Sequence, residues 1–366
     1  MAASPHDVEE EAMSYRIGVL LGDDIGPEVV PEAVRVAKAA LKAAGVDVAW
    51  IDVPIGRAAY ETLGNTLPEG TLERLAELDG WVLGPIGHRA YPREPNALNP
   101  HPVIRRHFDL YANIRPAYSH ANVSCLHKDV DLVIVRENNE GFQPDRNMFR
   151  GAGEFMPTED IAMSVRVITR RAAARLARVA FDLAKRRKSH VTCVHKDTVF
   201  KMGCGLFAEE CRKTAEACPD VAYDEVIVDT FALELVMRPR RFDVVVTTNL
   251  FGDIMSDLAA GLVGGLGLAP ALQMGPAYAM AQAAHGSAPD IAGQGIANPY
   301  AEIMSLKMLL DWLGASKEDG AMRAAAKAVE GAVERVIAEG KSLTPDLGGN
   351  ASTQEMGKAV AGLVAA

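Results

Sequence analysis

The chain has 366 residues, of which 49% are hydrophobic and 23% are charged, and its formal net charge is −10. This length and composition predict a globular protein of one large domain or two. The negative charge, with no Lys/Arg stripe to offset it, argues against nucleic acid and anionic membranes as partners but not against a small anionic substrate.

The N-terminal residues and the cysteines indicate the cellular compartment of the protein. Residues 1–14 are polar and acidic, which predicts a flexible tail. The five cysteines are odd in number and lack a zinc-binding spacing. With no signal peptide and no apolar run long enough to span a membrane, we expect a cytoplasmic protein.

The first hundred residues alternate between strand and helix patterns. Residues 15–21 predict a strand, the sequence GDDIGPE (22–28) a loop, and Pro27 the first turn of a helix that ends near Gly45. A strand at 46–53, a short helix within 67–80 and a strand at 81–87 follow, so we expect a parallel α/β sheet. Residues 88–102 contain four prolines and predict a functional loop.

Three arginines lie beside apolar segments in the middle of the chain, namely Arg105, Arg115 and Arg136. Arg136 directly follows the apolar run 130–135, which predicts a buried strand. A guanidinium group binds a carboxylate through two parallel hydrogen bonds. Most arginines, taken singly, are ordinary surface residues, and this alternative stays open for each.

The next segment predicts an extended arm at 145–165, a helix at 170–188 and a strand that delivers His195 and Lys196. Lys196 is a candidate general base, with a plain salt-bridge role as the alternative. A helix at 205–216 and a strand at 225–228 lead to Asp229, a carboxylate at a predicted strand end.

Residues 242–257 (FDVVVTTNLFGDIMSD) predict a buried strand, a turn at 247–249 and a helix from about Gly252. Asp253 and Asp257 are four residues apart, so a helix places both carboxylates on one face. Oxygen ligands of this kind suit Mg²⁺ or Mn²⁺. The alternative is a solvated acidic helix face.

The remaining chain holds a glycine-rich bend at 261–270, a long loop at 285–299 and helices at 299–314, 320–339 and 351–364. The spacing G-x-G-x-x-G opens no helix, which argues against a Rossmann dinucleotide site. Ordered loops as long as 285–299 are usually functional.

These motifs together resemble those of the β-decarboxylating dehydrogenases, the isocitrate / 3-isopropylmalate / tartrate–malate dehydrogenase family, over about residues 15–340. The resemblance rests on five features. They are GDDIGPE, the three arginines, VHK ending at Lys196, NLFGDIMSD, and HGSAPDIAG followed by the dipeptide NP at 298–299. It implies an α/β, isopropylmalate-dehydrogenase-like two-domain fold with a mixed, mostly parallel sheet. Residues 15–114 plus 268–366 would form a large cofactor-binding domain, and 115–267 a small substrate, metal and dimerisation domain of a homodimer.

The resemblance also implies roles for particular residues. Arg105, Arg115 and Arg136 would hold substrate carboxylates, and Lys196 would take the proton of the C2 hydroxyl. The implied ligands of Mg²⁺ or Mn²⁺ are Asp229, Asp253 and Asp257, with Lys196 and Asp229 coming from the partner subunit. The implied cofactor-binding residues are His285, Gly286, Ser287, Ala288, Asp290 and Asn298. Asp290 favours NAD, because a carboxylate there repels a 2′-phosphate.

The sequence departs from the family pattern at four positions. Gln143 replaces the tyrosine that protonates the enolate, and an amide cannot serve as an acid, so water or Tyr118 would have to act instead. Thr198, Gln282 and Asp24 stand where Asn, Glu and Gly are usual.

The function implied is NAD- and metal-dependent oxidative decarboxylation of a 3-substituted (2R)-malate, a hydroxy-diacid. Asn99 and His101 precede Arg105 where the C3 substituent is contacted, and favour a polar substituent over a branched alkyl group; a solvent-facing His101 is the alternative. Gln143 and Gln282 leave two other readings open, a non-catalytic or regulatory homologue and a dehydrogenase that stops at the β-keto acid.

Overall fold

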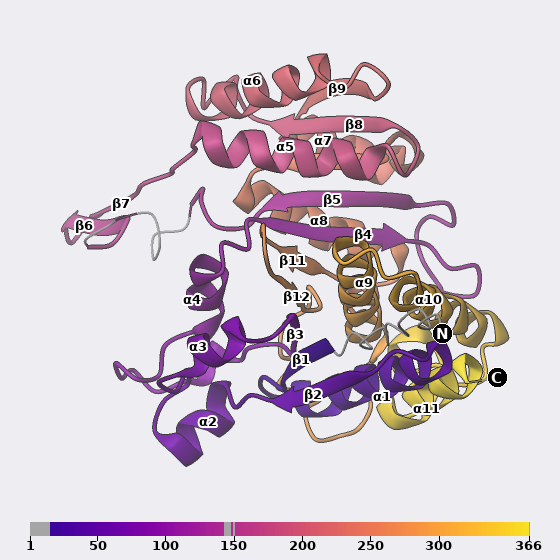
Figure 1. The fold of residues 1–366 in the computed structure, drawn as a ribbon. Coiled ribbons are helices and arrows are strands. Elements are labelled where there is room, and N and C mark those ends of the chain that lie inside the picture. Colours follow the sequence, from indigo (N-terminus) through magenta and orange to yellow (C-terminus); the bar gives the residue numbers. More distant parts are fainter. Residues whose placement is uncertain (1–14, 143–147, 149–150, 366) are drawn as a thin grey trace, which may run out of the picture.

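The computed structural model describes residues 15–142, 148 and 151–365 (Figure 1). Two predictions, the tail at 1–14 and the role of Gln143, fall outside these residues. No helix in the described part of the chain is long and apolar enough to cross a membrane. The five cysteines, all within it, are free thiols.

Ten strands form one mixed sheet, in the order β2-β1-β3-β12-β11-β4-β5-β10-β8-β9. Its ladders are parallel except for those that join β12 to β11, β11 to β4 and β4 to β5. The predicted mixed, mostly parallel sheet is therefore confirmed. The strands are β1 (Tyr15–Leu20), β2 (Val48–Asp52), β3 (Gly80–Leu83), β4 (Ala112–Tyr118), β5 (Asp131–Glu137), β8 (His190–His195), β9 (Ala222–Ile227), β10 (Val244–Thr247), β11 (Leu272–Met274) and β12 (Ala279–Ala281).

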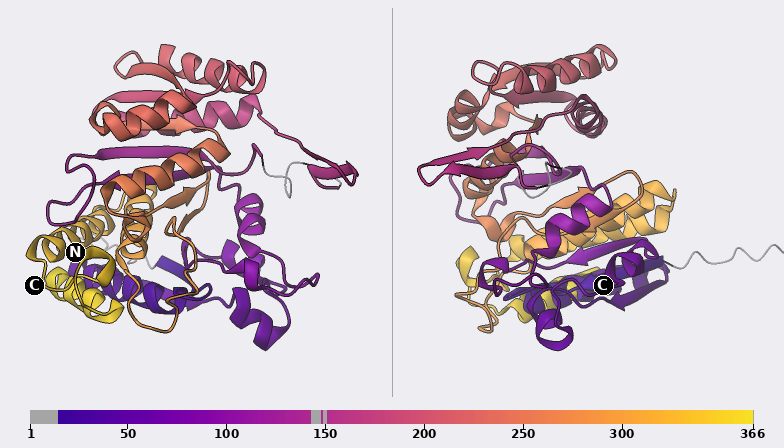
Figure 2. Two further views of the ribbon diagram at one scale, coloured as in Figure 1. Left: turned by 180° about the vertical axis from the view of Figure 1, so that it is seen from behind. Right: turned by 90° about the vertical axis from the view of Figure 1, so that its left-hand side faces the viewer.

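Helices cover both faces of this sheet (Figures 1 and 2). They are α1 (Gly26–Ala44), α2 (Gly56–Leu63), α3 (Thr71–Ala76), α4 (Pro100–His107), α5 (Arg170–Ala184), α6 (Gly203–Glu216), α7 (Val228–Met237), α8 (Asn249–Val263), α9 (Tyr300–Ser316), α10 (Gly320–Glu339) and α11 (Thr353–Val364). The helix predicted after GDDIGPE is α1, with Pro27 in its first turn and Gly45 ending it in the left-handed conformation (φ 70°).

Strands β5 and β10 are buried on both faces because each carries an uninterrupted apolar run, residues 132–135 and 244–246. In β5, Val133 and Val135 pack in the cluster that contains α5 and α6. The intervening Leu132 and Ile134 pack in the opposite cluster, with α7 and α8. Successive strand side chains point to opposite faces, so a continuous apolar run such as LVIV (132–135) requires a helix layer on each side.

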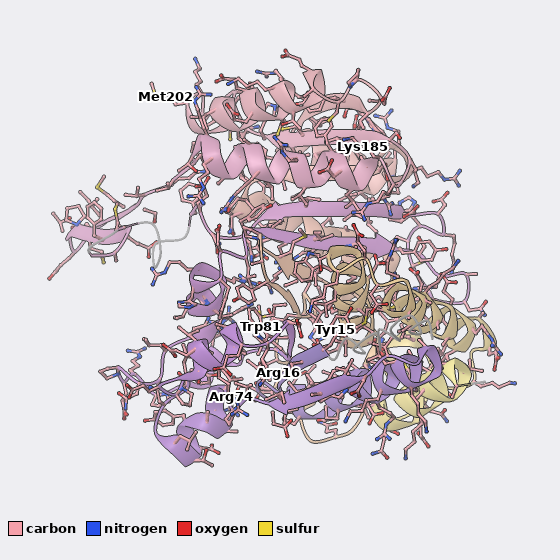
Figure 3. All side chains as sticks on the ribbon, in the orientation of Figure 1. Tyr15, Arg16, Arg74, Trp81, Lys185 and Met202 are labelled. Atoms are coloured by element: carbon pink, nitrogen blue, oxygen red, sulfur yellow. The ribbon has the colours of Figure 1, made fainter. Side chains whose placement is uncertain are left out.

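The other half follows the same rule around β1, β3 and β12. Val82 and Tyr15 belong to the core built by α1, α9, α10 and α11. Trp81 points the other way and packs with Ile104 of α4. Tyr15 and Trp81 are both fully buried and are labelled in Figure 3. The apolar clusters thus divide much as the predicted domains 15–114 plus 268–366 and 115–267 do, and the domain division itself stays a prediction.

The structure corrects the prediction that residues 88–102 are loop throughout. Helix α4 begins at Pro100 and includes His101 and Pro102. The first turn of a helix tolerates proline because its N–H groups have no intrahelical acceptor. Asn99 caps this helix, since its side chain accepts a hydrogen bond from the backbone N–H of His101 at 3.1 Å.

Five further elements, α7, β11, β12, β6 (Glu154–Thr158) and β7 (Ile161–Ser164), were not predicted as such from the sequence. Asp229 lies in the first turn of α7, a helix that the apolar pattern did not predict, rather than at a bare strand end. The short strands β11 and β12 were not predicted either. The predicted arm contains an antiparallel hairpin of β6 and β7, whose residues are all exposed and which projects from the body of the molecule (Figures 1 and 2).

Candidate active site

A cavity of about 310 Å³ collects many of the residues that the sequence analysis singled out. Its wall includes Asn99, which caps α4, His101 and Arg105 from α4, Arg115 from β4, Arg136 from β5, Asp253 from α8, and His285 and Gly286 from the loop after β12. These residues come from segments far apart in the sequence. The fold therefore brings the predicted substrate, metal and cofactor regions to a single concave site.

A buried glutamine organises one wall of the cavity. Gln273 of β11 is 1% exposed, and its Oε1 accepts hydrogen bonds from Arg105 Nε at 2.6 Å and Asn138 Nδ2 at 3.1 Å. Its Nε2 lies 2.8 Å from Gln282 Oε1 and 3.2 Å from His101 Nε2. His101 therefore faces the cavity rather than solvent. A buried amide with both ends engaged holds its neighbours in fixed orientations.

Arg115 and Arg136 meet on the carboxylate of Asp253. Both side chains are buried, at 7% and 5% exposure, on the neighbouring strands β4 and β5. Arg115 Nη1 lies 3.1 Å from Asp253 Oδ1, and Arg136 Nη1 donates to the same oxygen. Asn249 also holds Arg136, through its backbone carbonyl at 3.0 Å and its Oδ1 at 2.8 Å. Two oriented guanidinium groups at one place favour an anionic ligand.

The predicted metal ligands do not come together within one chain. Asp253 and Asp257 share a face of α8, and Arg115 Nη1 lies 3.8 Å from Asp257 Oδ1. Asp229 pairs instead with Lys196, and neither of these two lines the cavity. Across the described ranges, no group of three or more His, Cys, Asp or Glu is placed to hold a metal ion.

The donor chemistry on α8 still suits a divalent cation. Asp253 and Asp257 are about half exposed, so both have oxygens open to solvent. Burial raises the pKa of Asp257, and the Asp253 charge adds to this effect, while Arg115 opposes it. Two neighbouring carboxylates of this kind provide hard oxygen ligands, and a third from another subunit would complete the set.

The loop predicted to bind the cofactor runs along the edge of the same cavity. His285 Nδ1 lies 2.9 Å from the Gly286 carbonyl, and its buried Nε2 has no partner among the described residues. Burial lowers the pKa of His285, so its ring is neutral at pH 7. A side chain added at Gly286 would meet open space. An unsatisfied ring nitrogen beside an open backbone fits a polar ligand such as a nucleotide.

The rest of this loop is tied to the body of the protein. The Ser287 carbonyl accepts a hydrogen bond from the Ile25 N–H at 3.2 Å. Asn298 Nδ2 donates to Asp346 Oδ2 at 2.9 Å. Ala288 has a positive φ of 43°, and the exposed Asp290 accepts at its carbonyl from Gln294. The loop is thus positioned by contacts to α1 and to residues near the C-terminus.

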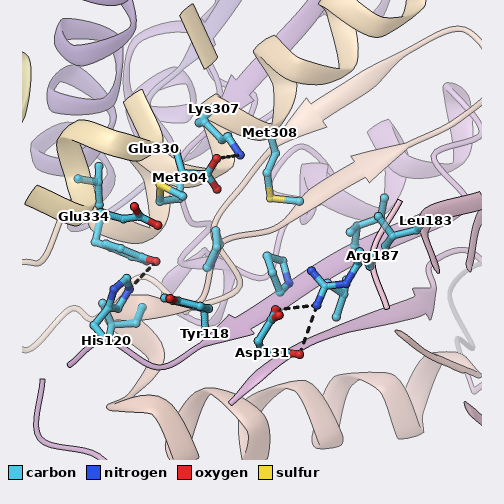
Figure 4. Close-up of a pocket in the computed structure, with 17 residues that line it drawn as sticks. Tyr118, His120, Asp131, Leu183, Arg187, Met304, Lys307, Met308, Glu330 and Glu334 are labelled. Atoms are coloured by element: carbon cyan, nitrogen blue, oxygen red, sulfur yellow. Dashed lines mark hydrogen bonds and ion pairs between the residues drawn. The ribbon is translucent and has the colours of Figure 1, made fainter. Parts of the chain in front are cut away.

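The structure does not place Tyr118 in this cavity. Tyr118 lines a different cavity of about 370 Å³, shown in Figure 4. The charged side chains there are largely paired with one another, Asp131 with Arg187 and Lys307 with Glu330. His120 and Tyr300 share a hydrogen bond of 2.9 Å. Tyr118 therefore cannot stand in for the missing tyrosine within one chain, and apart from Tyr118 this second cavity contains none of the predicted site residues.

The sequence analysis missed several polar residues of the site, namely Asn113, Asn138, Asn249, Ser256 and Gln273. Each hydrogen-bonds with a predicted arginine or with another member of this set. A signal was present for Gln273, a lone polar residue in the apolar segment 268–274, and for Asn113 in the segment that carries Arg115. Buried polar residues within strands are uncommon and usually have a specific partner.

The sequence and the fold of this chain are similar to those of known proteins. The family model described as isocitrate/isopropylmalate dehydrogenase matches residues 16–360. The isocitrate/homoisocitrate dehydrogenase of Thermus thermophilus is 43% identical over 95% of this chain and 98% of that protein. The 3-isopropylmalate dehydrogenase of Archaeoglobus fulgidus is 42% identical over 95% and 99%. The crystal structure of isocitrate dehydrogenase from Methylococcus capsulatus superposes with a TM-score of 0.85 at 40% identity, covering 96% of this chain and 100% of that one.

Proposed function

We propose, from the premise that this chain belongs to the isocitrate/isopropylmalate dehydrogenase family, that it oxidatively decarboxylates a 3-substituted (2R)-malate with a polar C3 substituent, using NAD. The chain is an oxidoreductase, a β-decarboxylating dehydrogenase of the isocitrate/isopropylmalate/homoisocitrate class.

The polar wall of the cavity carries the choice of C3 substituent. Asn99, His101 and Gln273 line the cavity, and His101 and Gln273 are within hydrogen-bond distance of each other. An alkyl substituent gains about 0.8 kcal/mol for each CH₂ buried against apolar groups, and this wall offers few of them. A carboxylate or hydroxyl substituent would instead find donors. We therefore favour isocitrate or a similar tricarboxylate over 3-isopropylmalate.

The chain's own residues then have distinct tasks. Arg105, Arg115 and Arg136 bind and orient the substrate carboxylates, and the buried position of the last two excludes water from them. Lys196 of the partner subunit takes the proton of the C2 hydroxyl. Asp253 and Asp257 would hold a divalent cation, which would supply Lewis-acid polarisation of the substrate oxygen, and NAD bound at the loop 285–299 would supply the hydride acceptor.

We infer a homodimer from the positions of Lys196 and Asp229. Lys196 and Asp229 pair with each other, and neither lines the cavity of their own chain. Lys196 holds the pKa of Asp229 below its ordinary value, so this carboxylate is anionic at neutral pH and available as a ligand. We propose that the pair completes the site of the other subunit. The five unpaired cysteines further lead us to propose a reducing compartment, the cytoplasm.

A substrate panel tests the proposal. Isocitrate, homoisocitrate, 3-isopropylmalate, D-malate and tartrate would each be supplied with NAD or NADP, with Mg²⁺, Mn²⁺ or EDTA. Reduced cofactor is measured by absorbance and CO₂ release in parallel. We expect the highest kcat/KM with a tricarboxylate, NAD and metal. A preference for 3-isopropylmalate would refute the assignment of the polar wall.

Gln143 favours one alternative that the same assay resolves. An amide does not protonate an enolate, and Gln143 lies outside the described residues. An enzyme that stops at the β-keto acid would form NADH without CO₂, and the keto acid would be trapped as its hydrazone. A regulatory homologue, the other reading, would bind substrate and nucleotide but form neither product.

A further inference from the structure

Asp24 and Arg57 form an ion pair beside the proposed cofactor loop. Arg57 Nη1 lies 3.0 Å from Asp24 Oδ1, and the side chains are 39% and 5% exposed, respectively. Asp24 adopts a φ of 51°, in the left-handed region where glycine is the unstrained residue. The chain therefore places a nearly buried carboxylate at an unfavourable backbone position, where it holds a guanidinium group.

The backbone around this pair is fixed by Asp23. The buried Asp23 carboxylate accepts hydrogen bonds from the backbone N–H groups of Arg57 and Gly87, both at 2.7 Å. It also accepts one from the Tyr91 hydroxyl at 2.6 Å. The start of α2 and the loop after β3 are thus tied to the GDDIGPE loop, so the position of Arg57 relative to these loops is well defined.

Asp24 and Arg57 meet the cofactor loop at Gly87. A methyl group placed on Gly87 would lie 2.5 Å from Asp24 Oδ2, 3.2 Å from Ser287 Oγ and 3.3 Å from Arg57 Nη2. The neighbours of Gly87 in the chain, Ile86 and His88, line the candidate cavity, as do His285 and Gly286 next to Ser287. The guanidinium group of Arg57 therefore lies at the rim of the cavity, beside the loop proposed to bind the nucleotide.

One edge of this guanidinium group is available to a ligand. Nη1 is engaged by Asp24, whereas Nη2 has no hydrogen-bond partner among the residues that the structure describes. Ser287 Oγ provides a second donor beside it. An arginine with a free N–H edge next to a hydroxyl group is well suited to bind a phosphate group.

We propose that Arg57, held in place by Asp24, binds the diphosphate of the dinucleotide cofactor, an inference that rests on the proposed NAD-dependent function. The 2′-phosphate of NADP is the other phosphate that a guanidinium could bind. The exposed carboxylate of Asp290 in the same loop disfavours that second anion, so the diphosphate is the phosphate that this site takes.

Equilibrium binding of nucleotide fragments tests this assignment without turnover. Titration calorimetry would measure ADP, 2′-AMP and adenosine binding to the full-length wild type, R57Q and R57K. We expect R57Q to weaken ADP about tenfold, in line with the loss of one hydrogen bond to a charged group, and to leave adenosine unchanged. R57K should recover most of the ADP affinity and the salt dependence of ADP binding that R57Q loses.

The matched control is R35Q. Arg35 pairs with Glu32 at 2.9 Å with nearly the same exposures, 43% and 5%, and does not line the candidate cavity. R35Q also leaves a buried carboxylate without its arginine, so it reports any general effect on the fold, and thermal unfolding of both variants checks this. We expect R35Q to bind ADP as the wild type does.

Two results would overturn the assignment of Arg57 while leaving the proposed function intact. One is equal ADP affinity in the wild type and R57Q, and the other is an R57Q defect confined to 2′-AMP. A wild-type protein that binds none of the three probes would instead remove the nucleotide site itself, and the role of Arg57 with it.

Discussion

The buried Glu302 leads to a prediction about stability and pH. Glu302 lies in the first turn of α9 and is fully buried. Its Oε2 accepts a hydrogen bond from the Ala283 N–H at 3.1 Å, and its Oε1 has no partner among the described residues. Burial raises the pKa of this carboxyl from 4.5 to about 8, and the Ala283 bond offsets part of the effect. The folded protein therefore keeps a proton on Glu302 at neutral pH.

The sign of the pH dependence follows from this pKa. Between about pH 4.5 and pH 8 the folded state holds a proton that the unfolded state releases, so the free energy of unfolding falls as pH rises. A rise in pKa from 4.5 to about 8 corresponds to at most about 5 kcal/mol, of which about 3 kcal/mol is lost between pH 5.5 and pH 8. The stabilisation from Glu302 is complete only below the pKa that this carboxyl has in the unfolded chain, about 4.5.

The substitution E302Q isolates this contribution, because an amide of the same shape stays neutral at every pH. Urea unfolding at pH 5.5 and pH 8, followed by tryptophan fluorescence, would give both free energies for each protein. We expect the wild type to lose about 3 kcal/mol more than E302Q over this range. Glu137, whose pKa burial raises to about 7, is present in both proteins and cancels in the difference.

Substitution of the exposed Glu69 by Gln provides the control, and should leave the pH dependence unchanged. If wild type and E302Q lose stability in parallel between pH 5.5 and pH 8, then Glu302 is ionised in the folded protein and the reasoning from its burial is wrong.

Three further predictions concern the site. R136K should lower kcat/KM about 100-fold or more, because one ammonium group cannot replace the bonds that Arg136 makes to Asp253 and Asn249; unchanged kcat/KM would refute its role. Mn²⁺ and substrate together should raise the unfolding temperature by more than the sum of their separate effects, because the cation competes with Arg115 and Arg136 for Asp253; simple additivity in a thermal-shift assay would contradict this. H101L should shift the ratio of kcat/KM values for 3-isopropylmalate and isocitrate at least tenfold toward 3-isopropylmalate, and an unchanged ratio would exclude His101 from recognition of the C3 substituent.

Much of the fold was predictable because its strands and helices carry strong periodic patterns. The continuous apolar run before Arg136 and the capped amphipathic segment after GDDIGPE correspond to β5 and α1. Helix α4 was missed because its prolines occupy the one turn that tolerates them. Strands β11 and β12 have three residues each, too short for an alternation to be recognised.

The candidate site was predictable where a residue type implies its chemistry and not where it depends on a tertiary partner. Arginines beside apolar segments and two acids one turn apart indicated a charged site, and the fold brings Arg115, Arg136 and Asp253 together. Gln273 has no such signature, since its importance comes from three segments that meet around it, α4, Asn138 after β5 and Gln282 after β12. The sequence pattern of one chain carries no signal for a contact between two subunits. The proposed contribution of Asp229 from a second subunit therefore remains a prediction.

The first described helix, α1, and the last, α11, pack in the same layer of the molecule. The hydroxyl of Tyr15, the first residue of β1, donates to Asp319 Oδ2 at 2.8 Å, across 304 positions of sequence, and α1 packs against α11. During synthesis on the ribosome, the apolar face of α1 must therefore wait for nearly the whole polypeptide to emerge, whereas the segment from β5 to α8 can fold much earlier. Closure of such distant contacts is slow and leaves hydrophobic surface open in the meantime.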